Sequence, residues 1–164
     1  MQRVTSVSPN EVAVSTAVIL NGKEQPGASI ELFDSSGGSR VTKGIFIYNP
    51  PQNYFPAEQM QVGMRWKLGY EAVAPLFSSV PSHTINGEAR VVSQEALKAE
   101  VGTLNAFKVE MVTYSSVNPG EPSRCLFWLS LDALVPVRMN CTLPIKGQAT
   151  ARMVTQLKRV KRAA

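Results

Sequence analysis

Hydrophobic and polar residues alternate along this chain with a period of two residues rather than the 3.6 residues of a helix. The clearest example is the segment 87–116, in which the apolar residues Phe107, Val109 and Met111 alternate with charged residues. Such alternation is typical of a β-strand with one buried and one solvated face. We therefore expect strands in the best-patterned part of the chain.

The remaining sequence predicts short strands separated by turn residues. Within 87–116, Gly102 and Thr103 mark a break between two strands. Further strands are predicted at Glu11–Leu20, Ala28–Phe33, Val41–Tyr48, Met64–Val73, Cys125–Leu129, Val135–Leu143 and Gln148–Leu157. Segments rich in Gly, Pro, Asn and Ser separate them, at residues 21–27, 34–39, 49–56 and 117–123. A helical composition is confined to two short segments, 56–61 and 94–100.

These patterns predict a mainly β protein, built as a single curved antiparallel sheet or an incomplete barrel with little helix and with hairpins as its main connections. A chain of 164 residues with 44% hydrophobic and 18% charged residues is long enough for one compact domain and too short for two. We expect residues 1–164 to form that single β-rich domain. No apolar stretch approaches the roughly 20 residues with which a helix crosses a bilayer.

Positive charge is concentrated at the end of the chain, in a basic tail from about residue 158. The net charge is +5, and the tail residues Lys158, Arg159, Lys161 and Arg162 supply four of these charges, so the rest of the chain carries +1. A nearly neutral body gives no support to a nucleic-acid-binding surface. The tail has two interpretations: a solvated terminus, or a contact with an anionic membrane surface or an acidic partner.

Both cysteines lie in one stretch, RCLFWLSLDALVPVRMNC, at residues 124–141. If Cys125 lies opposite Cys141 in an antiparallel hairpin, one face of that hairpin is apolar, because Phe127 then faces Met139, Leu129 faces Val137 and Leu131 faces Val135. The other face pairs Leu126 with Asn140, Trp128 with Arg138 and Ser130 with Pro136. Cysteine pairing and hydrophobic pattern thus favour the same register.

That register predicts a disulfide between Cys125 and Cys141. Directly opposed residues of antiparallel strands approach to about 4.5–5.5 Å, which a disulfide can bridge. The bond would stabilise the fold by roughly 3 kcal/mol in the chain-entropy model. The alternative is a pair of buried free thiols on the apolar face. A metal site is not expected, because two cysteines without His or acidic neighbours are too few ligands.

The sequence offers little material for catalysis. The lone histidine, His83, lies in VPSHTING, which has the composition of an exposed loop, and a solvated histidine is the ordinary interpretation. No nucleophile elbow, phosphate-binding glycine loop or zinc-binding HExxH pair is present, and the carboxylates are scattered. We therefore expect no catalytic residue, no metal, no cofactor and no enzymatic activity.

Aromatic residues gather in the first half of the chain and at Phe107. The strand around Phe46 and Tyr48 is apolar on both of its faces, which is typical of a strand that is covered on both sides or lines a hollow. Ordinary core packing is one interpretation. The other is a groove for a lipid, an acyl chain or a partner peptide, with Phe46, Tyr48, Trp66 and Phe107 as its lining candidates.

Three segments carry a resemblance to known proteins: FPAEQMQVGMRW (Phe55–Trp66), INGEARVVSQEALKAEVGTLNAFKVEMV (Ile85–Val112) and FWLSLDALVPVRM (Phe127–Met139). Their motifs and order resemble a group of β-rich envelope proteins of Gram-negative bacteria, mostly of unknown function. That group is similar to the lipoprotein-carrier fold, a sheet curved into an incomplete barrel around an apolar hollow. The resemblance implies a periplasmic location, where the two cysteines would be oxidised.

Taken with the resemblance, the residues predict a non-enzymatic envelope protein that binds a hydrophobic ligand, such as a lipid or acyl chain, in a sheet groove. The alternative is a structural or scaffold subunit of an envelope complex, docked to its protein partner through a sheet edge. The opening MQRVTSVSPNEVAV contains no apolar core of a secretory signal, as would also hold if a leader had been removed.

Overall fold

The structure is a computed structural model of the 164-residue chain. It describes residues 2–8, 11–16, 19–20, 23–24, 29–34, 38–43, 47–50, 52–53, 60–73, 82–99, 102–130, 136–144 and 151–156. All regular structure among them is β-strand, as the alternating pattern predicts. In this part of the chain no helix is present that could span a membrane.

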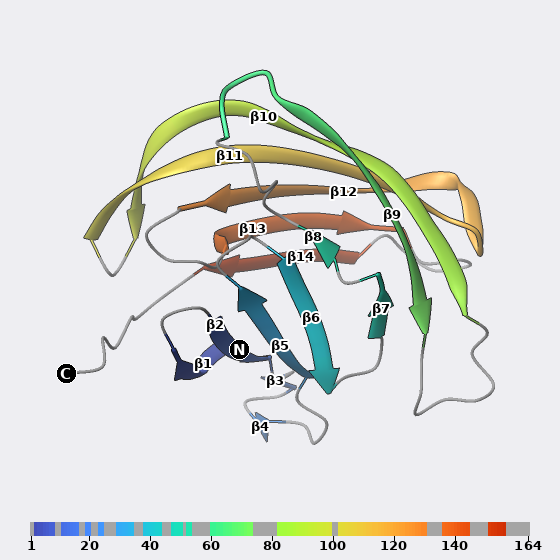
Figure 1. The fold of residues 1–164 in the computed structure, drawn as a ribbon, viewed down its shortest axis with the longest axis horizontal. Coiled ribbons are helices and arrows are strands. Elements are labelled where there is room, and N and C mark those ends of the chain that lie inside the picture. The colour runs from blue at the N-terminus through green and yellow to red at the C-terminus, as the bar shows by residue number, and fades with distance from the viewer. Residues whose placement is uncertain are drawn as a thin grey trace.

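A curved antiparallel sheet forms a half-barrel (Figure 1). It is made of β9 (Arg65–Val73), β10 (His83–Ala99), β11 (Gly102–Ser115), β12 (Asn118–Leu129), β13 (Pro136–Leu143) and β14 (Ala151–Gln156), each paired with the next, and β7 (Ile47–Asn49) pairs with the end of β9. The predicted incomplete barrel is therefore confirmed.

The preceding strands form a five-stranded sheet on the concave side of the half-barrel (Figure 1). Its members are β1 (Gln2–Val7), β2 (Glu11–Thr16), β5 (Ser29–Asp34), β6 (Gly38–Lys43) and β8 (Gln52–Asn53). A separate pair joins β3 (Ile19–Leu20) to β4 (Lys23–Glu24). The two larger sheets meet where β6 contacts β7 and β8 contacts β9.

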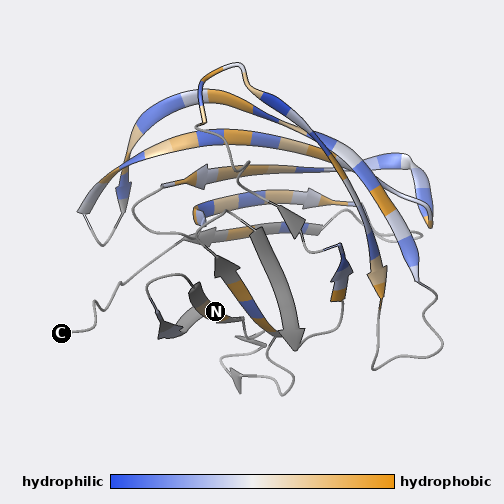
Figure 2. Ribbon diagram, viewed as in Figure 1, coloured by the Kyte–Doolittle hydropathy of each residue, from blue (hydrophilic) through white to orange (hydrophobic). Residues whose placement is uncertain are grey.

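Alternation gives the half-barrel an apolar inner face and a mostly polar outer face. On β9, Leu68, Tyr70 and Ala72 are buried, and the residues between them are exposed. The same alternation of hydropathy along the strands is visible in Figure 2. Each strand thus contributes every second side chain to the interior.

A β-bulge in β10 changes which residues face inward. Val91 pairs with Val109, but Ser93 pairs with Lys108, so Val92 is an extra residue and is 40% exposed. Because the alternation is shifted by one residue, the part of β10 after the bulge turns Leu97 toward the outer face. The helical interpretation of residues 94–100 is wrong for 94–99, because these residues belong to strand β10.

The hairpin of β12 and β13 confirms most of the predicted register. Cys125 pairs with Cys141, Leu126 with Asn140, Phe127 with Met139 and Trp128 with Arg138. The predicted pairs Leu129–Val137 and Ser130–Pro136 are wrong, because a bulge after Trp128 pairs Leu129 with Pro136. The predicted pair of Leu131 and Val135 lies outside the described residues.

Several turn and loop predictions are also wrong. The predicted turns 21–27, 34–39 and 49–56 contain β4, the first residues of β6, and β8, respectively. The proline-rich segment 117–123 belongs mainly to β12, which begins at Asn118 directly after the turn at Ser116 and Val117. His83 is the first residue of β10, pairs with Ala72 and is half-buried rather than in an exposed loop. Strand β1 was not predicted, since its residues Gln2–Val7 mix polar and apolar side chains evenly.

Candidate functional site

The inner face of the half-barrel carries one large apolar cluster. Its members come from β9 to β13 and from the segment just before β9: Met60, Leu68, Ala89, Val91, Val109, Met111, Phe127, Leu129 and Cys141 are buried, and Met64, Trp66, Phe107, Cys125, Met139 and Leu143 pack against them half-buried. Four of the six methionines of the chain belong to this inner cluster. Methionine is unbranched and flexible, so this surface can adapt its shape.

A small hollow lies within the inner cluster. It is lined by Trp66, Leu68, Ala89, Val109, Met111, Phe127 and Leu129, and its volume is about 10 Å³. A hollow of that size has room for about one water molecule. Trp66 Nε1 is buried and has no hydrogen-bond partner among the described residues.

The four lining candidates do not all gather at this hollow. Trp66 lines the hollow. Phe107 packs against the inner cluster but does not line the hollow. Tyr48 is not among the lining residues, and Phe46 lies outside the described residues. Sequence reasoning missed the aliphatic lining residues because it selected aromatic side chains, and it missed Phe127 because it placed that residue in the disulfide hairpin alone. The alternation with Trp66 along β9 identifies Leu68.

Tyr48 instead forms an aromatic pair with Tyr70. The ring centroids are 5.1 Å apart and the rings meet edge to face at 70°. Burial raises the pKa of Tyr48 above 10.0, and the negative charge of Glu31 on β5 raises it further. Burial likewise raises the pKa of Tyr70, with a smaller contribution from Tyr48. Both phenols are therefore neutral at physiological pH.

The outer face has a smaller cluster built around Trp128. Leu97, Ala106, Trp128 and Val137 are buried there, with Leu104 and Leu126 packed against them. Trp128 Nε1 donates a hydrogen bond to Glu95 Oε1. Lys108 Nζ lies 5.4 Å and Arg138 Cζ 4.9 Å from the centre of the Trp128 ring, so two cations contact the indole. These contacts leave Trp128 only 6% exposed.

Cys125 and Cys141 form a disulfide between β12 and β13, as the register predicts. The two sulfurs are therefore neither thiolate nucleophiles nor metal ligands. No group of three or more His, Cys, Asp or Glu side chains able to hold a metal occurs in the described segments. The predicted contact residues Lys158, Arg159, Lys161 and Arg162 lie outside the described residues.

Comparisons with known protein families, with curated proteins and with solved structures find no match to this chain. The resemblance to envelope proteins therefore rests on the three sequence segments that carry it.

Proposed function

We propose that the protein binds a hydrophobic ligand, such as a lipid or an acyl chain, on the inner face of the half-barrel. The methionine-rich apolar surface around the hollow at Trp66 is the observation that carries this proposal. In keeping with the sequence resemblance, the proposed location is the periplasm, and the proposed role is non-enzymatic.

The ligand must displace side chains to enter, because the hollow holds only about one water molecule. Met60, Met64 and Met111 are the natural candidates for this movement. Met60 and Met64 flank the turn at Val62 and Gly63 beside β10, and a methionine side chain repacks at low cost. Adaptable methionine surfaces suit ligands of variable shape.

The chain contains an internal control for testing this proposal. Of its two tryptophans, Trp66 lies on the inner face and Trp128 on the outer face. Titration of the protein with a fatty acid or a lysolipid should shift or quench the emission of Trp66. The change should persist in W128F, which retains Trp66, and vanish in W66F, which retains only the tryptophan of the outer face.

A second test uses the protein as purified. Extraction and mass spectrometry of freshly prepared protein should release a lipid. If no lipid is bound and the emission of Trp66 does not change, the apolar inner face is an ordinary packed core and not a ligand site.

A scaffold role is the second candidate, and the edge of β14 favours it. Among the described residues, β13 is the one strand paired with β14, and Val154 on β14 is 55% exposed. Unpaired strand edges can accept a strand from a partner. A scaffold would lack bound lipid, and a crosslinker placed at Val154 would couple it to one defined protein neighbour.

A further inference from the structure

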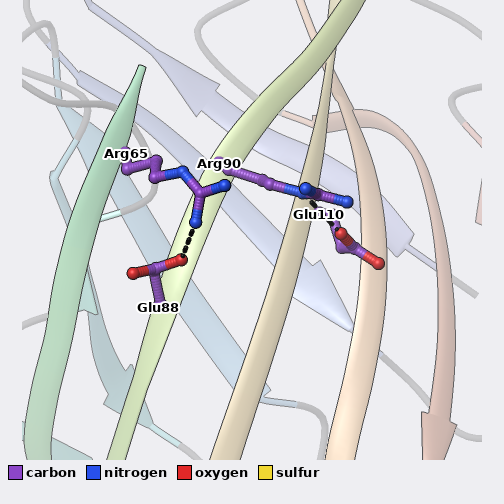
Figure 3. A network of polar contacts seen from close by, with 4 residues as sticks. All are labelled: Arg65, Glu88, Arg90 and Glu110. Atoms are coloured by element: carbon purple, nitrogen blue, oxygen red, sulfur yellow. Dashed lines mark hydrogen bonds and ion pairs between the residues drawn. The ribbon is translucent and has the colours of Figure 1, made fainter. Parts of the chain in front are cut away.

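Charge on the outer face of the half-barrel is divided unevenly between its two halves. On β9 and β10, basic and acidic side chains alternate and pair. Arg65 Nη1 lies 2.9 Å from Glu88 Oε1, and Arg90 Nε lies 2.8 Å from Glu110 Oε2 on β11 (Figure 3). This half of the outer face is close to neutral.

The outer face of β11 to β14 carries four cations, which we name the basic zigzag: Lys108, Arg124, Arg138 and Arg152. One residue comes from each strand. Lys108 and Arg138 flank Trp128 in one cross-strand row, and Arg124 and Arg152 flank Thr142 in another. The rows are four residues apart along the strands, or about 13 Å, and cations in one row are about 10 Å apart.

Counter-charges are scarce inside the basic zigzag. The row between the two cationic rows holds Glu110, Leu126, Asn140 and Val154. Glu110 is already paired with Arg90. None of the four cations forms an ion pair with a residue that the structure describes. Outside these rows, the carboxylate of Glu95 lies at the Trp128 ring that Lys108 and Arg138 contact. The four cations still outnumber the nearby carboxylates, so this part of the outer face attracts anions.

Two of these cations are held in place. Lys108 and Arg138 both contact the ring of Trp128, which is buried and hydrogen-bonded to Glu95. Arg124 and Arg152 are exposed. Arg124, Arg138 and Arg152 lie on β12 to β14, which are drawn straighter than the arch of β10 and β11 in Figure 1, and Lys108 lies on β11.

We propose that the basic zigzag binds the surface of an anionic phospholipid bilayer. The site is distinct from the inner face, and it does not depend on the ligand proposed there. Its four residues span about 14 Å by 13 Å, which is far smaller than the interface of a stable protein complex. A charged bilayer requires no shape complementarity, and each cation near its surface adds to the attraction. In the sequence, four more cations follow β14, at Lys158, Arg159, Lys161 and Arg162.

The test is sedimentation of the full chain with vesicles at low ionic strength, either of phosphatidylcholine alone or with phosphatidylglycerol added. The wild-type protein should sediment with the anionic vesicles and not with the neutral ones. R124Q/R152Q should bind the anionic vesicles roughly 30-fold more weakly. K67Q/K98Q is the matched control, because it removes the same charge from exposed positions on β9 and β10 and should bind like the wild type.

Three results would overturn the proposal. The first is wild-type protein that ignores anionic vesicles at low salt, even if it binds poly-glutamate, which would assign the basic zigzag to an acidic protein. The second is an equal loss in K67Q/K98Q, which would show that net charge alone matters. The third is undiminished binding in R124Q/R152Q with complete loss when Lys158–Ala164 is deleted, which would assign the attraction to the tail. Unchanged melting temperatures show that the variants fold.

Discussion

Trp128 on β12 and Glu95 on β10 are joined by a hydrogen bond that passes over the intervening strand β11. The indole is buried, so its N–H would lose hydration without replacement if this carboxylate were removed. We expect E95A to lower the free energy of unfolding by roughly 1 kcal/mol. Glutamine keeps an acceptor oxygen, so E95Q should lose less. Urea unfolding followed by tryptophan emission measures both, and an E95A variant as stable as the wild type would show that the bond contributes nothing.

Gly87 on β10 lies against the backbone of β11. A Cβ atom at this position would collide with the carbonyl oxygen of Val112 and would lie 2.8 Å from Thr113 Cα. Backbone atoms in a paired strand cannot move aside cheaply, so G87A should lower the free energy of unfolding by about 1–3 kcal/mol. Thermal unfolding compared with the wild type measures the loss.

Gly120 provides the matched control for that substitution. It also lies in a strand, β12, but no heavy atom lies within 4 Å of the position that its Cβ would occupy. G120A should therefore leave the melting temperature nearly unchanged. A G87A variant as stable as G120A would contradict the close approach of β10 and β11.

The disulfide should contribute measurably to stability. Cys125 and Cys141 are 16 residues apart, and closing a loop of this size stabilises a fold by roughly 3 kcal/mol. C125S/C141S should lose about that amount relative to the oxidised protein. Intact mass after alkylation without reductant reports the oxidation state, and two labelled thiols in protein made under oxidising conditions would contradict the bond.

Stability should decline at high pH because of Tyr48 and Tyr70. Both have a pKa raised above 10.0 in the fold, so the unfolded chain releases these protons first as the pH rises. The free energy of unfolding should therefore fall from about pH 10 upward, until the folded-state pKa values are passed. Tyrosinate absorbance should show Tyr48 and Tyr70 ionising late. Y48F should weaken the pH dependence, and a folded protein that shows no late-ionising tyrosine would contradict the burial.

The alternating pattern was sufficient to predict the half-barrel, because a sheet with one buried face repeats every two residues. Its failures have local causes. Residues 94–99 have a helical composition, yet they extend β10 because the long partner strand β11 pairs with them through Gly102. Asn118 and Pro122 are typical of turns, but they belong to β12. The pairing of β12 with β11 extends this strand from Arg124 back to Asn118.

The bulges were beyond the reach of sequence patterns. Val92 follows another valine, and Val137 is an ordinary strand residue, so the residue type alone marks neither of them as the extra residue in its strand. The site was predicted only in part for a related reason. Trp66 was found because it is aromatic, but the pairing of β9 with β10, and of β10 with β11, decides that Ala89 and Val109 share its hollow.

The bond between Cys125 and Cys141 also makes the chain between them a closed ring. If a protease cuts once within this ring, both new ends stay attached to the same molecule. Such a nick leaves the apparent mass on a non-reducing gel unchanged, and two fragments separate when a reductant is added. The β12–β13 hairpin can therefore lose the continuity of its backbone without losing either of its strands.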